Sequence, residues 1–163
     1  MSAVISDCGR YRYRLDRPGA GSWSTAVIMV NPSTADATAD DATIRKLKGF
    51  ADRQSWGHLI IGNLFAYRAT DVRELGRVQD PVGPENDEHL IQILASVDQV
   101  VCAWGPLTKQ PKQWRNRYLN VLALIRGAGL LPQSIGAPAQ CGHPKHPLML
   151  AYDTPLVLWS PPT

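Results

Sequence analysis

Short apolar runs alternate with longer amphipathic stretches along the chain. Runs of this length that are rich in β-branched residues are typical of strands buried on both faces of a sheet. Four runs are predicted as such strands: Thr25 to Val30, His58 to Leu64, Asp98 to Ala103 and Leu130 to Ile135. The alternating segment Arg10 to Leu15 predicts a half-exposed strand, and Pro155 to Trp159 predicts a short edge segment.

Three helices are predicted between these runs. Asp40 or Asp41 can cap a helix that continues to about Arg53. Pro84 and the acids after it start a second helix, and Gln113 to Arg126 form a third. Alternation of buried strands with helices predicts an α/β fold whose mostly parallel sheet is covered on both faces.

Ligands of such sheets bind at the carboxyl ends of the strands. The loops that leave the predicted strands there carry unusual residues: Asn31-Pro32-Ser33, Asn63 with Phe65, Tyr67 and Arg68, Trp104-Gly105-Pro106, and His143-Pro144-Lys145-His146-Pro147. We therefore expect these loops to converge on one pocket.

The two asparagines are the first candidates for chemistry. The Asn31 amide could hold a water or a polar substrate edge, or it could bond its own turn. Asn63 ends an apolar strand, where an amide is costly unless it is paired. Its donor and acceptor match the edge of a nucleobase, and a bond to a neighbouring loop is the alternative. Phe65 could stack on a planar ring or belong to the core.

A histidine from the proline-rich loop is the second candidate. Either His143 or His146 could donate to an oxygen that gains negative charge. Together with Cys141 they also suggest zinc, but the spacing is not that of a standard site and a fourth ligand would be needed. No metal or other cofactor is therefore expected.

Acidic and polar residues near these loops complete the candidates. The carboxylates of Asp36, Asp40 and Asp41 could act as general bases or bind a cation, although helix capping is the simpler interpretation. Tyr67, Arg68 and Asp71 could form a polar rim or an Arg–Asp pair that fixes the loop.

Length and composition add limits. The 163 residues are assigned to one domain, 1–163, with a basic N-terminal β segment at 10–25 and a core at 26–159. No apolar run reaches the roughly 20 residues of a membrane helix, and the first ten residues lack an export pattern. Three cysteines do not make a disulfide framework. We expect a cytoplasmic protein without a membrane partner.

The net charge of +3 does not by itself indicate a nucleic-acid partner. Basic residues nevertheless gather at 10–17 and 109–117 beside aromatic residues, a mixture that suits contact with a nucleic-acid backbone. The candidate backbone contacts are Arg12, Arg14, Lys109 and Lys112. Solvated surface is the alternative interpretation.

From about Gly9 to Leu150 the chain resembles domain-of-unknown-function family 1643, a family of small bacterial and phage proteins. The blocks that carry the resemblance are Met29 to Asp36, Asp41 to Arg45, Asn63 to Asp71, Gly83 to Asp87, Ala103 to Gly105 and His143 to Leu148. The family has no established activity, so this resemblance implies none.

A more distant resemblance is to the uracil-DNA glycosylase superfamily. It rests on motifs in the same order: Asn31-Pro32, Asn63, Trp104-Gly105, and His143-Pro144 or His146-Pro147. It implies a three-layer α/β/α sandwich with a central, mostly parallel sheet of about four strands. It also implies that Asn31 holds the attacking water, Asn63 reads the base, Phe65 stacks and a histidine binds the departing oxygen. The further substrate contacts would be Pro32, Ser33, Tyr67, Arg68 and Trp104.

These observations predict a nucleobase-recognising protein that hydrolyses the N-glycosidic bond of an ordinary or modified base in DNA. Its partner would be DNA or a nucleotide. Because fold likeness does not transmit function, two alternatives stand beside this hypothesis. One is a catalytically inactive module that binds a nucleotide or modified nucleic acid, and the other is a small-molecule enzyme that processes nucleosides.

Overall fold

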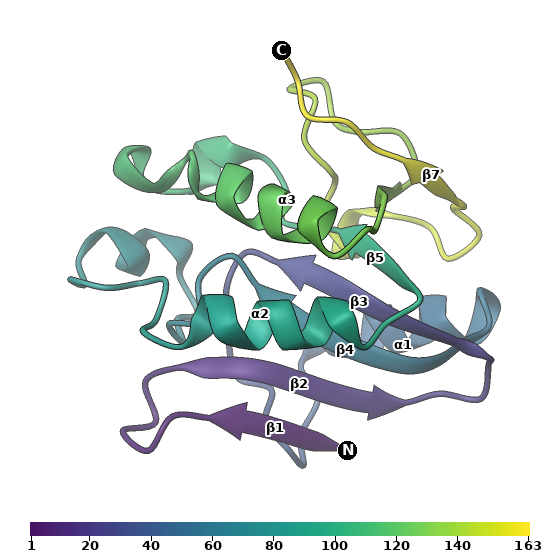
Figure 1. Ribbon diagram of the computed structural model, residues 1–163, viewed down its shortest axis with the longest axis horizontal. Helices are drawn as coiled ribbons and strands as arrows, with labels where there is room; N and C mark the ends of the chain where they lie inside the picture. Colours follow the sequence, from purple (N-terminus) through teal and green to yellow (C-terminus); the bar gives the residue numbers. More distant parts are fainter.

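The computed structural model describes Met1 to Thr163 and contains one mixed sheet of seven strands (Figure 1). The strands are β1 Ser2–Ile5, β2 Arg12–Pro18, β3 Trp23–Met29, β4 Trp56–Asn63, β5 Gln99–Cys102, β6 Pro132–Ile135 and β7 Leu156–Leu158. Their order across the sheet is β1-β2-β4-β3-β5-β6-β7. Strands β4, β3, β5 and β6 pair in parallel, whereas β1, β2 and β7 pair antiparallel to their neighbours.

The α/β class is therefore confirmed, and the expected number of about four strands is wrong. The four apolar runs form β3, β4, β5 and β6. The predicted half-exposed strand and the predicted edge segment form β2 and β7, and β1 is the strand that was not predicted. Strand β1 was not predicted, because it has only four residues, Ser2–Ile5. These residues alternate between exposed and half-buried positions, so they form no apolar run. A glycosylase-like sandwich is not established by this topology.

Three helices cover the sheet: α1 Ala42–Arg53, α2 Asn86–Ala95 and α3 Arg117–Gly127. Helix α1 lies behind the sheet in Figure 1, and α2 and α3 lie in front of it. Four short 3₁₀ helices connect the elements: η1 Val72–Gly76, η2 Leu107–Lys109, η3 Lys112–Trp114 and η4 Pro147–Met149. Asp41 is the N-cap of α1, since its Oδ1 accepts a hydrogen bond from the Ile44 N–H at 2.9 Å.

Strand β3 shows why the central runs are apolar throughout. Ala26 and Ile28 pack in the cluster beneath α2 and α3, whereas Val27 and Met29 pack in the cluster beneath α1. Successive side chains of a strand point to opposite faces, so a strand covered on both sides must be apolar at every position. No helix combines the length and the apolar character needed to cross a membrane.

The loops after β3 and β4 run side by side beyond the ends of the strands. The Leu64 N–H donates to the Met29 carbonyl and the Phe65 N–H to the Val30 carbonyl, each at 2.9 Å. Farther along, the Ala69 N–H donates to the Pro32 carbonyl at 2.9 Å. These bonds hold the segment that contains Asn31 against the segment that contains Asn63.

Candidate functional site

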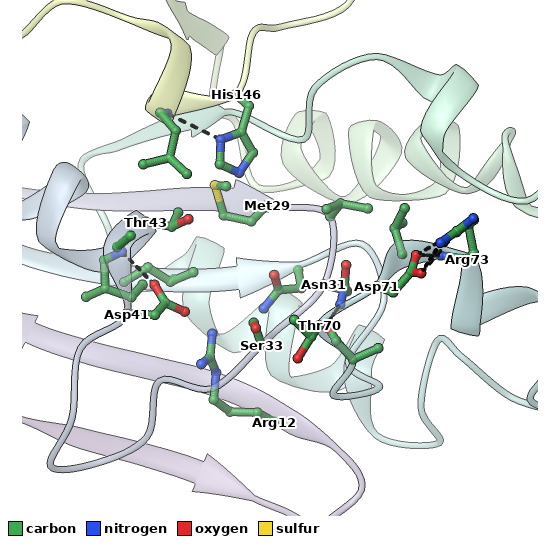
Figure 2. A pocket seen from close by; sticks show the side chains of 18 residues that line it. Arg12, Met29, Asn31, Ser33, Asp41, Thr43, Thr70, Asp71, Arg73 and His146 are labelled. Atoms are coloured by element: carbon green, nitrogen blue, oxygen red, sulfur yellow. Dashed lines mark hydrogen bonds and ion pairs between the residues drawn. The ribbon is translucent and has the colours of Figure 1, made fainter.

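A cavity of about 600 Å³ lies at the carboxyl ends of β3 and β4, against the N-terminus of α1 (Figure 2). Its polar lining comes from distant parts of the chain and includes Arg12, Asn31, Asp41, Asn63 and His146. Figure 2 shows Arg12 and His146 entering the cavity from opposite sides, with Asn31 between them. A volume of this size is typical of a site for a small organic ligand.

The amide of Asn63 is buried in this lining without a hydrogen-bond partner. Its side chain is 1% exposed, and neither the nitrogen nor the oxygen of its amide has a hydrogen-bond partner. A buried polar group without a partner costs about 1–3 kcal/mol. Because Asn63 lines the cavity, a ligand with a complementary donor and acceptor would remove this cost.

The Asn31 side chain is held in one orientation. Its Nδ2 donates to the Ala69 carbonyl at 2.7 Å and to the Pro32 carbonyl at 3.1 Å. Both N–H groups are thereby used within the protein, and the Oδ1 accepts no hydrogen bond. Asn31 thus presents an acceptor to the cavity, where a water or a substrate hydroxyl could donate to it.

His146 presents a donor. Its Nδ1 accepts a hydrogen bond from the Leu148 N–H at 3.2 Å, which places the proton of the neutral ring on Nε2. Burial and the nearby Lys109 lower the pKa of His146, although Asp41 opposes them. The ring is therefore neutral at pH 7, and its Nε2–H can donate to an oxygen of a bound ligand.

His143, the other candidate, does not line the cavity. It is 5% exposed, its Nδ1 lies 3.5 Å from the Nε1 of Trp104, and its ring packs edge-on against Tyr118. Of the two candidate histidines, His146 lines the cavity and His143 does not.

Several predicted substrate contacts lie outside the cavity. Phe65 is fully buried in the core against Trp114, so the ring that was expected to stack on a base cannot reach the cavity. Trp104 is also a core residue, and it borders an adjoining cavity of about 80 Å³. Tyr67 lines two other cavities, of about 350 and 410 Å³, and Arg68 lines the second of them.

Within the Asn31-Pro32-Ser33 segment, Ser33 lines the cavity and the buried Pro32 does not. In place of an aromatic ring, the cavity offers aliphatic and thioether surfaces from Met29, Val30 and Val72. These apolar contacts could still enclose a planar ring.

The predicted nucleic-acid contacts are scattered. Arg14 pairs with Asp16 at 2.7 Å, and Lys109 and Lys112 are exposed on η2 and η3. Arg12 is 3% exposed, so it is not part of an exposed basic surface. It lines the cavity instead.

An irregularity in β2 explains the position of Arg12. In the pairing with β1, Arg12 is opposite Ile5 and Arg14 is opposite Val4, so one extra residue is inserted in β2. A β-bulge of this kind changes the face to which the following side chains point. It puts Arg12 on the same face as Leu15, on the α1 side of the sheet.

Arg12 has few partners for a buried cation. One terminal nitrogen donates to the Ala35 carbonyl at 2.6 Å, and its Nε has no partner. Burial lowers the pKa of Arg12 to about 10, with Arg68 and Arg17 acting in the same direction and Asp41 against them. The guanidinium still carries its charge at neutral pH.

The carboxylates near the cavity have distinct roles. Asp40 pairs with Arg17 at 2.6 Å and with Lys48 at 3.0 Å, and the Oδ1 of Asp36 accepts from the N–H groups of its own turn. Both fix the loop before α1. Asp41 caps the helix and also lines the cavity.

The ion pair of Asp71 is made with another arginine than the one predicted. Asp71 pairs with Arg73 at 2.7 Å, not with Arg68, and hydrogen bonds from Arg73 lower the pKa of Asp71 to about 2. Both residues line the cavity, and Asp71 also caps η1. Because these two charges neutralise each other, Arg12 and Asp41 are the charged groups of the cavity that have no ion-pair partner.

The cysteines and histidines do not gather into a metal site. Cys102 is buried in β5, Cys141 is exposed, and no group of three or more His, Cys, Asp and Glu side chains is arranged to hold a metal ion. The donor set of the cavity is instead amide, imidazole, hydroxyl, guanidinium and a single unpaired carboxylate.

A family model described as "Protein of unknown function (DUF1643)" matches residues 12–148. The chain belongs to the DUF1643 family. No curated protein and no solved structure matches the chain. The comparisons therefore do not support the likeness to uracil-DNA glycosylases. The matched region of this DUF1643 protein extends from Arg12 to Leu148, both of which line the cavity.

Sequence reasoning missed part of the lining of this DUF1643 cavity. Thr43, Thr70 and Arg73 are not among the residues predicted from the sequence, and Arg12 is predicted there as a nucleic-acid backbone contact. Thr43 could have been found, because it follows the helix cap Asp41 and the first turn of a helix after a strand faces the strand ends.

Proposed function

We propose that this protein binds a nucleobase in the cavity and hydrolyses the N-glycosidic bond that joins the base to its sugar. The observation that carries the proposal is the buried, unpaired amide of Asn63, which shares one cavity with the free Oδ1 of Asn31 and the Nε2–H of His146.

The case for a nucleobase rests on complementarity. An amide offers one acceptor and donors side by side, and the edge of a nucleobase offers the same arrangement in reverse. Asn63 has both groups unoccupied, and Met29, Val30 and Val72 provide apolar surface around it. A polar group that needs a partner, surrounded by apolar walls, selects for a flat ring with a hydrogen-bonding edge.

The reaction would need three kinds of help. A water oxygen forms a bond to the anomeric carbon of the sugar while the carbon–nitrogen bond breaks, and the base leaves with the bonding electron pair. Asn31 accepts a hydrogen bond from the water and so orients it, and Asp41 is the carboxylate available to accept the proton that the water loses. The Nε2–H of His146 donates to the base oxygen on which negative charge develops, and the departing base finally takes up a proton.

The test is release of free base. The protein is incubated with nucleosides, nucleotides and oligonucleotides that carry normal and modified bases, and released bases are identified by mass spectrometry. Base release should fall by at least about a hundredfold in Asn31→Ala and His146→Ala, since each removes a group that acts in the transition state. Asn120→Ala, on the exposed face of α3, is the control and should match the parent.

Two results would change the proposal. If Asn31→Ala and His146→Ala release base at the parental rate, the assignment of the site is wrong. If the parent binds bases but releases none, the protein is a binding module and the hydrolytic part of the proposal fails.

A further inference from the structure

The cavity holds a buried cation that the recognition of a base does not use. Arg12 is 3% exposed, and no carboxylate oxygen lies within 4.0 Å of its guanidinium nitrogens. A buried charge without an opposite charge is costly, so native proteins nearly always pair it. The protein itself therefore supplies no anionic partner for the guanidinium of Arg12.

The free hydrogen-bonding capacity of Arg12 is also large. A guanidinium has five N–H donors, and here one terminal nitrogen donates to the Ala35 carbonyl while the buried Nε donates to nothing. The β-bulge directs the side chain to the cavity, which Asp41 and Ser33 also line (Figure 2). The geometry leaves donors of Arg12 for a ligand.

The first turn of α1 adds donors next to this cation. Ala42 and Thr43 line the cavity, and neither of their main-chain N–H groups donates a hydrogen bond within the protein. The N-terminus of a twelve-residue helix carries partial positive charge, and N–H groups there bind phosphate readily. Arg12 and the first turn of α1 come from different elements, and both offer N–H donors and positive charge to an anion.

We propose that Arg12 and the first turn of α1 form a phosphate subsite, so that the substrate is a nucleotide and not a free base or nucleoside. This inference rests on the proposed function, because it assigns the phosphate to the sugar that carries the bound base.

The carboxylate of Asp41 favours a sugar phosphate over a bare anion as the ligand of this subsite. Its carboxylate lines the same cavity and would repel an isolated phosphate, although one of its oxygens is occupied by the Ile44 N–H. A sugar hydroxyl beside the phosphate would donate to the other oxygen. A phosphorylated sugar therefore supplies an anionic group for Arg12 and a separate, uncharged donor for Asp41.

The test is a comparison of affinities by isothermal titration calorimetry. The ligands are the five common nucleosides, their 5′-monophosphates, ribose 5-phosphate and DNA trinucleotides. The proteins are the parent, Arg12→Met, Arg12→Lys and Arg14→Met. Arg14 is the matched control, because it lies two residues away in β2 and its charge is already paired with Asp16.

In the parent and in Arg14→Met, a phosphate should increase affinity about ten- to a hundredfold over the matching nucleoside, as a charged hydrogen bond does. Arg12→Met should reduce this advantage to less than about threefold, and Arg12→Lys should retain part of it. A monophosphate that binds while the trinucleotide does not identifies a free nucleotide as the source of the phosphate, and the reverse identifies a strand.

Equal affinity of nucleosides and nucleotides for the parent overturns the subsite and leaves the proposed function standing. This comparison needs no variant, so it decides even if Arg12→Met fails to fold through loss of the bond to Ala35. If ribose 5-phosphate binds through Arg12 but no base, nucleoside or nucleotide does better, the subsite stands and the proposed function fails. An undiminished phosphate advantage in folded Arg12→Met also overturns the subsite.

Discussion

The Nδ2 of Asn86 donates to the main-chain carbonyl of Asn63 at 3.1 Å, and also to that of Leu64 at 3.2 Å. Asn86 begins α2 and is fully buried. The helix on one face of the sheet thereby holds the end of β4, whose last side chain enters the cavity on the other face.

This pair of hydrogen bonds predicts that Asn86→Asp strongly destabilises the folded protein. The change replaces the donor by a carboxylate that faces two carbonyl oxygens in a buried position, so the free energy of unfolding should fall by about 3 kcal/mol. Urea denaturation followed by circular dichroism measures it. Asn120→Asp, exposed on α3, is the control and should shift stability by less than about 0.5 kcal/mol. Equal effects of the two substitutions would show that the Asn86 amide does not support β4.

We expect Asn63→Leu to change the free energy of unfolding in the opposite direction. Asn63 is buried with both amide atoms unpaired, so a leucine of similar size removes a desolvation cost and should raise the free energy of unfolding by up to about 2 kcal/mol. The same variant should lose base binding entirely. Urea denaturation and calorimetric titration measure the two quantities. A loss of more than about 1 kcal/mol would mean that the amide is already paired in the folded protein, which would remove the main support for a ligand at this position.

The positions of Asn31 and Asn63 were predictable because Asn63 ends one parallel strand and Asn31 lies two residues after the end of its neighbour. Continuous apolar runs identify β3 and β4, and the carboxyl ends of neighbouring parallel strands lie at one edge of a sheet. The cap at Asp41 was also readable, since an aspartate before an amphipathic stretch is a common N-cap. These features depend on local sequence and on the general geometry of α/β folds.

Other parts of the site depend on features that periodicity does not contain. The face of Arg12 is set by a one-residue bulge, and an alternating sequence reads the same with or without it. His143 and His146 both precede a proline, so only the path of their loop decides which one lines the cavity. Phe65 lies two residues after Asn63, but the chain has left the strand there and its ring enters the core.

Arg17→Met tests how the loop before α1 is held. Arg17 is 1% exposed and donates to Asp40 at 2.6 Å, to the Asp36 carbonyl at 2.5 Å and to the Ala39 carbonyl at 3.3 Å. Removal of one member of a buried ion pair typically costs about 3–5 kcal/mol, and we expect that loss in thermal or urea unfolding. Lys48→Met is the matched control.

The Lys48 side chain also pairs with Asp40, but it is 43% exposed, so its loss should cost less than about 1 kcal/mol. If the two substitutions have similar effects, the loop that carries Asp41 to the cavity is not anchored by Arg17.

The lowered pKa of His146 predicts that the stability of the folded protein depends on pH. Burial lowers the pKa of His146 below its ordinary value of 6.5, and burial does the same for His143. As pH falls through 6.5, the unfolded chain takes up these protons before the folded protein does, so the free energy of unfolding decreases with decreasing pH. Above about pH 7.5 both states are neutral at these residues and the effect vanishes. Urea denaturation at a series of pH values between 7.5 and 5 measures the slope.

The slope should be smaller in His146→Gln than in the parent, because one of the two histidines whose pKa is lowered has been removed. The same slope in both proteins would show that His146 is as free to take up a proton in the folded protein as in the unfolded chain. That result would contradict its assignment as a neutral ring that donates from Nε2 into the cavity.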